Sequence, residues 1–273
     1  MALQCNGKFR PTFEFPTLLL RRLLNVFTSF LSFMLRRMFV PIEKTLINTV
    51  NVPKPALNHV TDETKILDLC SIDLPTAVQQ TSEVLAKGGC VAVPTDTVYG
   101  LVSSSRFLHK LFDVKRRDQT KPVGLFVHSP SVIRHYADIS VNDELLNKLL
   151  PGKVTLLFRR LANELTDNKT ELIGFRIPDD EFVRQLCSRC NEPLAQTSAN
   201  ISGQPSAISP EEFVDLWDAI DLIVVNSKRE MDQRRQGSTI IDLSVDGCYK
   251  IRRDGCSLGF YENILKSYGL LRI

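Results

Sequence analysis

The stretch CVAVPTDTVYGL, Cys90–Leu101, joins a short apolar run to a polar turn. Its first four residues, Cys90–Val93, follow Gly88-Gly89 and are all apolar, which predicts a buried strand. The remaining residues, Pro94–Leu101, place two threonine hydroxyls and a carboxylate where that strand ends. Ligands of open α/β sheets bind in crevices at the carboxyl ends of strands, so this junction indicates both a fold class and a candidate site.

Segments with helical and strand-like patterns alternate on both sides of this stretch. Helices are predicted at Pro75–Lys87, Phe107–Lys115, Asn142–Leu150, Glu181–Cys190 and Glu211–Ala219. Further strands are predicted at Val123–Val127, Val154–Phe158, Ile173–Ile177, Leu194–Gln196, Leu222–Val225, Ser238–Leu243 and Tyr249–Ile251. Many short strands among helices predict an α/β domain whose sheet has mixed strand directions.

The net charge of +3 is unevenly distributed along the chain. Residues 1–42 hold six basic residues and one acidic residue, so the other 231 residues sum to about −2. A general nucleic-acid binder needs many cations to neutralise phosphates. We therefore expect no stable direct binding of nucleic acid by the body of the protein.

The seven cysteines form no disulfide framework, which favours free thiols in a reducing compartment. Cys187 and Cys190 form a CxxC on a predicted helix, but no second pair follows, so we interpret them as two helix thiols. The four histidines are not at ligand spacing. The sequence predicts no metal site built from protein ligands.

The first 40 residues form a separate amphipathic, arginine-rich leader. Leu18–Val40 places Arg21, Arg22 and Arg36 on one helical face and leucines and phenylalanines on the other. This composition is typical of a mitochondrial transit peptide. A permanent membrane-surface helix and a disordered tail are the alternatives. Residues 41–62 are interpreted as a linker, and residues 63–267 as the catalytic domain.

Two more polar segments are predicted at ends of secondary structure. Lys115–Pro122 has four cations at a helix C-terminus, and Gln196–Gly203 carries hydroxyls and an amide after an apolar strand. Both segments can converge with Pro94–Leu101 on one crevice. The alternatives are a solvated helix end for the first and a simple turn for the second.

Together these segments resemble the YrdC-like family of threonylcarbamoyl-AMP synthases, and its eukaryotic members in particular. The similarity runs from about Ile66 to Phe260. It is carried by PTDTVYGL (Pro94–Leu101), the K-x-R of Lys115 and Arg117, LLPGKVTL (Leu149–Leu156), GFRIP (Gly174–Pro178), TSANISG (Thr197–Gly203) and STIIDL (Ser238–Leu243). Several long motifs in the family's order are a specific signal, whereas K-x-R alone is weak.

The resemblance implies a single α/β domain with a twisted mixed sheet and a large concave cleft flanked by helices. It implies a nucleotidyltransferase that joins L-threonine, bicarbonate and ATP into threonylcarbamoyl-AMP and releases pyrophosphate. Mg²⁺ is expected to arrive with ATP and to bridge phosphate oxygens. The product would supply a downstream tRNA threonylcarbamoyl-transferase complex that makes N6-threonylcarbamoyladenosine next to the anticodon. The expected location is the cytoplasm and the mitochondrion, with peripheral membrane contact through the leader.

The resemblance also implies roles for individual residues. Lys115 and Arg117, both expected at an exposed helix end, would be the catalytic clamp on the phosphates. The other ATP contacts would be Lys121, Thr155, Ser198, Asn200, Ser206 and Arg253, and the threonine contacts would be Thr97 and Ser238. Arg176 is either a further contact or a buried structural arginine. Phe126 stands where many relatives have a histidine, so no role follows for His128.

The chain departs from the family pattern at several positions. Arg116 and Asp118 replace a glycine and a proline, and Lys153 and Asp254 each replace a proline. None of these changes removes a proposed contact group. The alternative functions are a double-stranded RNA-binding module that uses the same basic cleft, a carbamoyl-transfer domain like that of hydrogenase maturation factors, and a membrane-associated regulator without catalysis.

Overall fold

The computed structural model describes residues 65–119, 121–161 and 170–273. The chain divides into two units, Met1–Ala56 and Leu57–Ile273, and all described residues belong to the second. The predicted leader and linker therefore lie outside the described residues. Within the described part, no helix is both long enough and apolar enough to cross a membrane.

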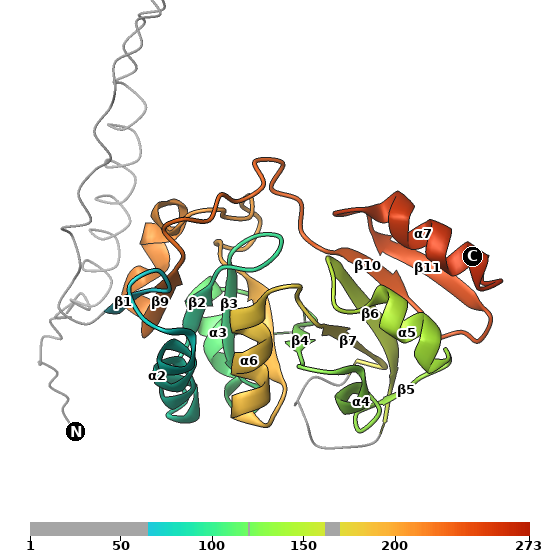
Figure 1. Ribbon diagram of the computed structural model, residues 1–273, viewed down its shortest axis with the longest axis horizontal. Coiled ribbons are helices and arrows are strands. Elements are labelled where there is room, and N and C mark those ends of the chain that lie inside the picture. The colour runs from blue at the N-terminus through green and yellow to red at the C-terminus, as the bar shows by residue number, and fades with distance from the viewer. Residues whose placement is uncertain (1–64, 120, 162–169) are drawn as a thin grey trace, which may run out of the picture. The chain divides into compact units, whose positions relative to one another are not determined.

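A single mixed sheet forms the centre of the described unit (Figure 1). Its strands are β1 (Lys65–Asp68), β2 (Val91–Val93), β3 (Gly100–Ser104), β4 (Gly124–Phe126), β5 (Ala137–Asp138), β6 (Val154–Arg160), β7 (Leu172–Arg176), β8 (Leu194–Ser198), β9 (Leu222–Val225), β10 (Thr239–Asp242), β11 (Cys248–Arg253) and β12 (Leu271–Arg272). The spatial order is β1-β9-β2-β3-β8-β4-β7-β6-β10-β11-β12, and β5 pairs with β6. Parallel and antiparallel neighbours both occur, as predicted.

The helices begin at residues suited to capping. The α-helices are α2 (Leu74–Ala86), α3 (His109–Lys115), α4 (Pro130–Ile133), α5 (Asp143–Leu149), α6 (Glu181–Cys190) and α7 (Leu258–Ser267), and the 3-10 helices are η1 (Ser105–Phe107) and η2 (Pro210–Ala219). The carboxylate of Asp73 caps α2, and that of Asp180 caps α6 by accepting from the Val183 amide. Such caps satisfy amides that lack helical partners. Helix α6 carries Cys187 and Cys190, which confirms their predicted placement.

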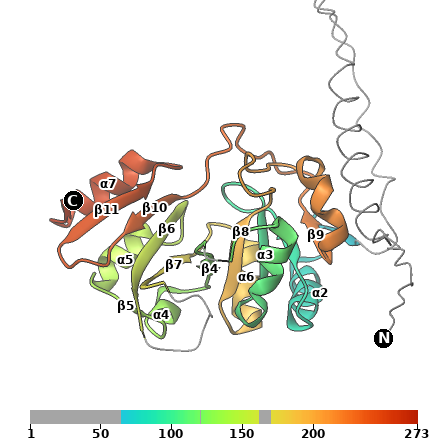
Figure 2. The same ribbon diagram turned by 180° about the vertical axis from the view of Figure 1, so that it is seen from behind.

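Helices cover the two faces of the sheet unequally. Helices α2 and α6 lie side by side and pack on one face of β9, β2, β3 and β8 (Figure 1). Helices α3 and α5, together with η2 and α7, pack on the opposite face, where residues such as Leu125, Leu156 and Phe175 are buried. Figure 2, seen from behind, shows α3 in front of the strands that it covers. The core under α2 and α6 contains no described residue of β7, β6 or β10. That face of the sheet is therefore left available for a cavity.

The structure differs from the predicted elements in several places. The polar turn after β2 ends earlier than predicted, because Gly100 and Leu101 already belong to β3 and pair with Ser198 and Thr197. The predicted helix 211–219 is a 3-10 helix with a kink at Phe213. The sequence reading also missed β1, β3, β5, β12, α4 and α7. Several of these elements are too short to show a periodic pattern.

Candidate active site

A cavity of about 500 Å³ lies over the uncovered face of the sheet. Its described lining includes five arginines, Arg117, Arg160, Arg176, Arg252 and Arg253, and contains no Asp or Glu. Hydroxyl groups are also frequent in this lining: Thr95, Thr155, Thr170, Thr197, Ser198, Ser206 and Ser238. A pocket with this composition is suited to a ligand with several negative charges.

The floor of the cavity is a row of residues on four neighbouring strands. Gln196 of β8 pairs with Gly124 of β4, which pairs with Gly174 of β7, and Gly174 pairs with Leu157 of β6. A Cβ on Gly124 would lie 2.5 Å from Gln196 Nε2, and one on Gly174 would lie 2.8 Å from Leu157 Cδ2. A side chain at either position would collide with Gln196 or Leu157, so the close approach of these two side chains to the backbone requires glycine.

The three polar segments converge, as predicted. The Ala199 amide donates to the Tyr99 carbonyl at 2.8 Å, and the Tyr99 amide donates to the Ala207 carbonyl at 2.8 Å. The ammonium of Lys115 contacts both Ser198 and Asn200. Pro94–Leu101, Lys115–Pro122 and Gln196–Gly203 thus meet at one end of the cavity, although they are far apart in the sequence.

Lys115 is buried, whereas the sequence placed it on an exposed helix end. Its side chain is 1% exposed, and it does not line the cavity. Its ammonium donates to the Ser198 carbonyl, to Ser198 Oγ at 3.3 Å and to Asn200 Oδ1 at 3.4 Å. Burial, aided by the nearby Arg117, lowers the pKa of Lys115 to about 7. The expected exposure of Lys115 is wrong, because helix α3 turns this residue toward Ser198 of β8.

We expect Lys115 to make folding stability depend on pH. Its folded pKa lies below its unfolded value, so between about pH 7 and 10 the unfolded chain binds more protons. The free energy of unfolding should therefore rise with pH by at most about 1.4 kcal/mol per unit, relative to Lys115→Met. Urea unfolding of both proteins at pH 7, 8 and 9 measures this difference. If the difference in free energy of unfolding between the wild-type protein and Lys115→Met were the same at all three pH values, the lowered pKa of Lys115 would be contradicted.

Arg117 is the residue of the K-x-R that reaches the cavity. Helix α3 ends at Lys115, and the left-handed conformation of the next residue, Arg116 (φ 49°), redirects the chain. Arg117 Nη2 donates to the Pro122 carbonyl at 3.1 Å, while its buried Nε has no hydrogen-bond partner among the described residues. Burial lowers the pKa of this guanidinium, which remains a cation near neutral pH because the ordinary value is so high. Its unsatisfied donor favours an anionic ligand.

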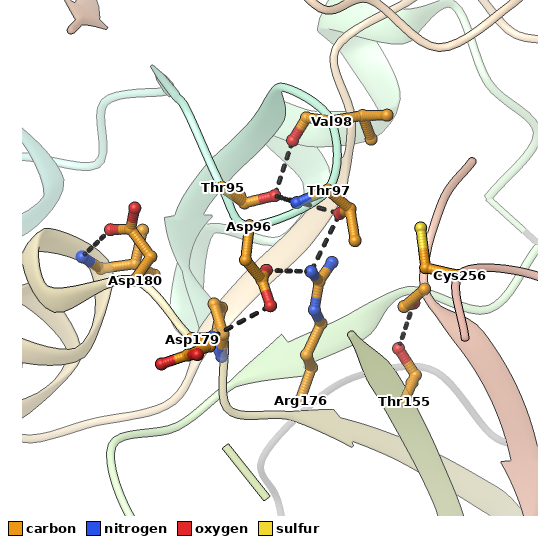
Figure 3. Close-up of polar contacts among 12 residues, drawn as sticks. Thr95, Asp96, Thr97, Val98, Thr155, Arg176, Asp179, Asp180 and Cys256 are labelled. Carbon is orange, nitrogen blue, oxygen red and sulfur yellow. Dashed lines mark hydrogen bonds and ion pairs between the residues drawn. The ribbon is translucent and has the colours of Figure 1, made fainter. Parts of the chain in front are cut away.

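Arg176 forms a buried ion pair with Asp96 (Figure 3). Its guanidinium also donates to Thr97 Oγ1 at 2.9 Å, and the second carboxylate oxygen of Asp96 accepts from the Asp179 amide at 3.0 Å. Arg176 lines the cavity, but Thr97 does not. Arg176 is therefore both structural and part of the lining. The sequence reading missed Asp96 as its partner, although the Asp of PTDTVYGL was a visible signal.

Ser238, Thr155 and Arg253 form a second polar group in the lining. The hydroxyls of Thr155 and Ser238 are 2.7 Å apart, and Arg253 Nη2 donates to Ser238 Oγ at 3.1 Å. Arg253 also donates to the Ser238 carbonyl. Burial and the nearby Arg176 lower the pKa of Arg253. The structure thus brings together one expected threonine contact and two expected ATP contacts.

The other expected site residues have different surroundings. Ser198 and Ser206 line the cavity. Asn200 lies behind the lining, where its amide donates to the carbonyls of Ile201 and Gln204, each at 2.8 Å. Lys121 is exposed, and neither it nor His128 belongs to the lining. The lining also contains Gln196 and Arg252, which sequence reasoning did not single out.

Residues 83–255 of the chain match a known protein family. They match the Sua5_yciO_yrdC family model, which is described as "Telomere recombination". Among curated proteins, the Bos taurus threonylcarbamoyl-AMP synthase is 42% identical over 196 residues, which are 68% of this chain and 71% of that protein. The Homo sapiens threonylcarbamoyl-AMP synthase is 40% identical over 197 residues, which are 68% of this chain and 70% of that protein.

Comparison with solved structures supports the same fold. The crystal structure of P. abyssi Sua5 complexed with L-threonine has a TM-score of 0.66 at 22% identity, and covers 77% of this chain and 62% of that one. The crystal structure of E. coli YciO has a TM-score of 0.58 at 22% identity, and covers 71% of this chain and 94% of that one. At these identities the likeness establishes the arrangement of the sheet and helices.

Proposed function

The chain belongs to the Sua5/YciO/YrdC family, and on this premise we propose that it is a threonylcarbamoyl-AMP synthase. The reaction joins L-threonine, bicarbonate and ATP, and releases pyrophosphate. The level of identity to curated synthases, over more than two thirds of each of those proteins, supports this activity. It is a nucleotidyl transfer in which the protein has to bind, orient and shield several anions.

The observation that carries the proposal is the charge of the cavity. ATP, bicarbonate and the threonine carboxylate are all anions, and the described lining has five arginines and no carboxylate. Arg117 and Arg253 have no ion-pair partner among the described residues, whereas Arg176 is paired with Asp96. Guanidinium groups held in a partly dry site interact with phosphates more strongly than they would in water. These two arginines are therefore the candidates for phosphate contacts.

The chemistry requires two bond-forming steps. The threonine amine adds to carbon dioxide derived from bicarbonate and forms a carbamate. The proton that the amine loses combines with the hydroxide released from bicarbonate, so one water molecule leaves. A carbamate oxygen then attacks the α-phosphorus of ATP, and the bond to the β-phosphate oxygen breaks as pyrophosphate leaves. Arg117 and Arg253 would hold the charge that develops on the phosphates. Lys115 would act as a positioning residue that holds the Ser198–Asn200 turn against the cavity.

Threonine would lie near the group formed by Ser238 and Thr155, next to Arg176. Ser238 lines the cavity, and its hydroxyl would exchange a hydrogen bond with the substrate hydroxyl. The described residues contain no group of three His, Cys, Asp or Glu side chains suited to a metal ion. We propose that Mg²⁺ enters as part of the ATP substrate, bound by its phosphate oxygens.

Omission of single substrates tests the proposed function. We expect pyrophosphate release only when ATP, L-threonine and bicarbonate are all present, with threonylcarbamoyl-AMP as the product seen by mass spectrometry. Pyrophosphate release at the same rate with and without L-threonine would contradict the assignment. Salt-dependent binding of double-stranded RNA without ATP would favour the alternative RNA-binding role instead.

We also propose where the product goes. The product would pass to a tRNA threonylcarbamoyl-transferase complex, in the cytoplasm and the mitochondrion. The leader, with its arginine-rich amphipathic pattern, would direct import or membrane contact.

The leader should be separable from catalysis, because it shares no motif with the domain that contains the cavity. A truncated protein that begins near Val60 should keep its turnover within about two-fold while it loses mitochondrial or membrane association. Pyrophosphate release and cell fractionation measure the two properties. A well-folded truncated protein without turnover would overturn this expectation.

A further inference from the structure

The segment between β9 and β10 crosses the sheet from one side to the other. Strands β2, β3, β8, β4, β7 and β6 lie between β9 and β10 in the sheet, and residues 226–237, which we call the strap, span this distance. Figure 1 shows the strap as an orange arch between the two strands. Its last residue, Gly237, and the following Ser238 line the cavity. The position of the strap therefore affects the shape of the cavity.

The end of the strap is attached to the segment that carries Arg253. The carbonyl of Gln236 accepts from the Cys256 thiol at 3.0 Å, and the carbonyl of Gly237 accepts from the Cys256 amide at 2.9 Å. Arg253 in turn donates to the Ser238 carbonyl. A displacement of the strap would therefore move Ser238 and Arg253 together.

The carboxylate of Glu212, at the start of η2, joins the strap to a second segment of the cavity. Arg235 of the strap donates to both carboxylate oxygens through its two terminal nitrogens, and the Ile208 amide donates to one of them at 3.0 Å. Ile208 follows Ser206, which lines the cavity, by two residues. One carboxylate thus connects the segment that carries Ser206 with the strap that leads to Ser238.

This connection is well defined in geometry and weak in energy. Two parallel hydrogen bonds between a guanidinium and a carboxylate fix both the distance and the relative orientation of the two groups. Within the described residues, no other ion pair of the strap reaches the segment that carries Ser206. The side chains of Arg235 and Glu212 are 39% and 31% exposed, and ion pairs with this exposure contribute little to the stability of a fold. The pair is therefore suited to setting a local distance rather than to holding the domain together.

We propose that Glu212 is a positioning residue that sets the distance between Ser206 and Arg253, and thereby the affinity of the cavity for ATP. This inference rests on the proposed function, under which both residues contact the nucleotide. Glu212 does not itself line the cavity, so it acts through the two segments that it joins. A nucleotide that contacts both segments at once binds more weakly when one of them is displaced or has to be ordered on binding.

The sign of the effect separates this role from a simple effect of charge. Glu212 is an anion, so electrostatics alone predicts that removing its charge makes the site more attractive to ATP. Removing the charge of Arg235 would make the site less attractive. A positioning role predicts that both changes weaken ATP binding, because either one breaks the same ion pair.

The test measures ATP binding by the full chain, with calorimetric titration in the presence of Mg²⁺. Glu212→Gln keeps an acceptor for the Ile208 amide and loses the ion pair, so the dissociation constant of ATP should rise about 3-fold or more. Arg235→Gln should have a similar effect, and the double variant should bind ATP no more weakly than the weaker single variant. Arg235→Lys keeps the charge but not the two parallel bonds, so it should give an intermediate value.

The ion pair between Arg106 and Glu192 supplies a matched control. It also has two guanidinium–carboxylate hydrogen bonds, at 2.9 and 3.2 Å, but neither residue lines the cavity. Glu192→Gln should leave the dissociation constant of ATP unchanged, and thermal melting should show that every variant is folded. The inference would be overturned by a dissociation constant that falls in Glu212→Gln, by no change in either single variant, or by an equal rise in Glu192→Gln.

The two proposals fail in different ways. If the wild-type protein makes threonylcarbamoyl-AMP, but Glu212→Gln and Arg235→Gln bind ATP as tightly as the wild type, the inference fails and the proposed function stands. If the wild-type protein binds ATP and both variants bind it more weakly, the inference stands even when no threonylcarbamoyl-AMP is formed. A wild-type protein that does not bind ATP contradicts both proposals.

Discussion

Threonine should be used over valine by roughly 10⁴-fold, measured as the ratio of kcat/KM in pyrophosphate release. Valine has the same shape as threonine but lacks the hydroxyl. A site built to hydrogen-bond that hydroxyl leaves its own polar groups unpaired when valine binds. Serine keeps the hydroxyl and loses only a methyl group, which is worth about 1–3 kcal/mol, so it should be a poor substrate rather than an inert one.

The structure shows which hydroxyl should decide this preference. Ser238 lines the cavity, so Ser238→Ala should narrow the threonine-to-valine ratio at least 10-fold. The variant also loses hydrogen bonds to Thr155 and Arg253, so thermal melting should show that it remains folded with a lowered Tm. Thr97 lies behind the lining, where its hydroxyl accepts from Arg176. Thr97→Val should therefore cost about 1–3 kcal/mol of stability and keep most of the preference. The reverse result, with the ratio narrowed by Thr97→Val alone, would place the substrate hydroxyl at Thr97.

Arg117→Ala should lower kcat/KM for ATP by on the order of 10²-fold or more. The guanidinium lines the cavity, and its partner among the described residues is a single carbonyl, that of Pro122. Removing a cation aimed at a phosphoryl transition state costs this much in comparable sites. The fold should tolerate the change, because Arg117 is only half-buried. Steady-state kinetics and thermal melting measure the two effects.

Two control variants test whether the effect of Arg117→Ala is specific to this position and to the guanidinium group. Lys148→Ala removes an exposed cation on α5 outside the cavity and should change kcat/KM less than two-fold. Arg117→Lys keeps the charge but not the planar donor geometry, so it should recover only part of the activity. Near-normal turnover by Arg117→Ala would show that Arg117 does not contact the phosphates.

Much of the fold could be predicted from local patterns. The apolar run Cys90–Val93 is followed by a turn, and the predicted strands at 154–158 and 222–225 correspond to β6 and β9. These segments are continuous and apolar, so their pattern depends little on the rest of the chain. The short elements β3 and β5 were missed, because their strand character comes from pairing with β8 and β6 rather than from their own residues.

The segments that form the candidate site could be predicted from the sequence, but the positions of their side chains at the cavity could not. The motifs identified Arg117, Ser198, Ser206, Ser238 and Arg253, all of which line the cavity. They could not show that Lys115 is buried behind that lining or that Thr97 belongs to the Asp96–Arg176 group. Side-chain direction at a helix end depends on what the helix packs against, and helix α3 packs toward β3 and β8.

The sequence by itself determined the fold class and the family, because apolar periodicity and the order of the motifs are properties of the chain. The tertiary structure alone decided which charges face the cavity and which are neutralised by a partner. Gln196 shows the difference most clearly. In the sequence it precedes a motif of hydroxyl residues, and no local pattern marks it as a site residue. The strand register places it opposite Gly124 in the cavity floor. Register joins residues about 70 positions apart, and the energy of that pairing comes from burial and hydrogen bonds that no local pattern contains.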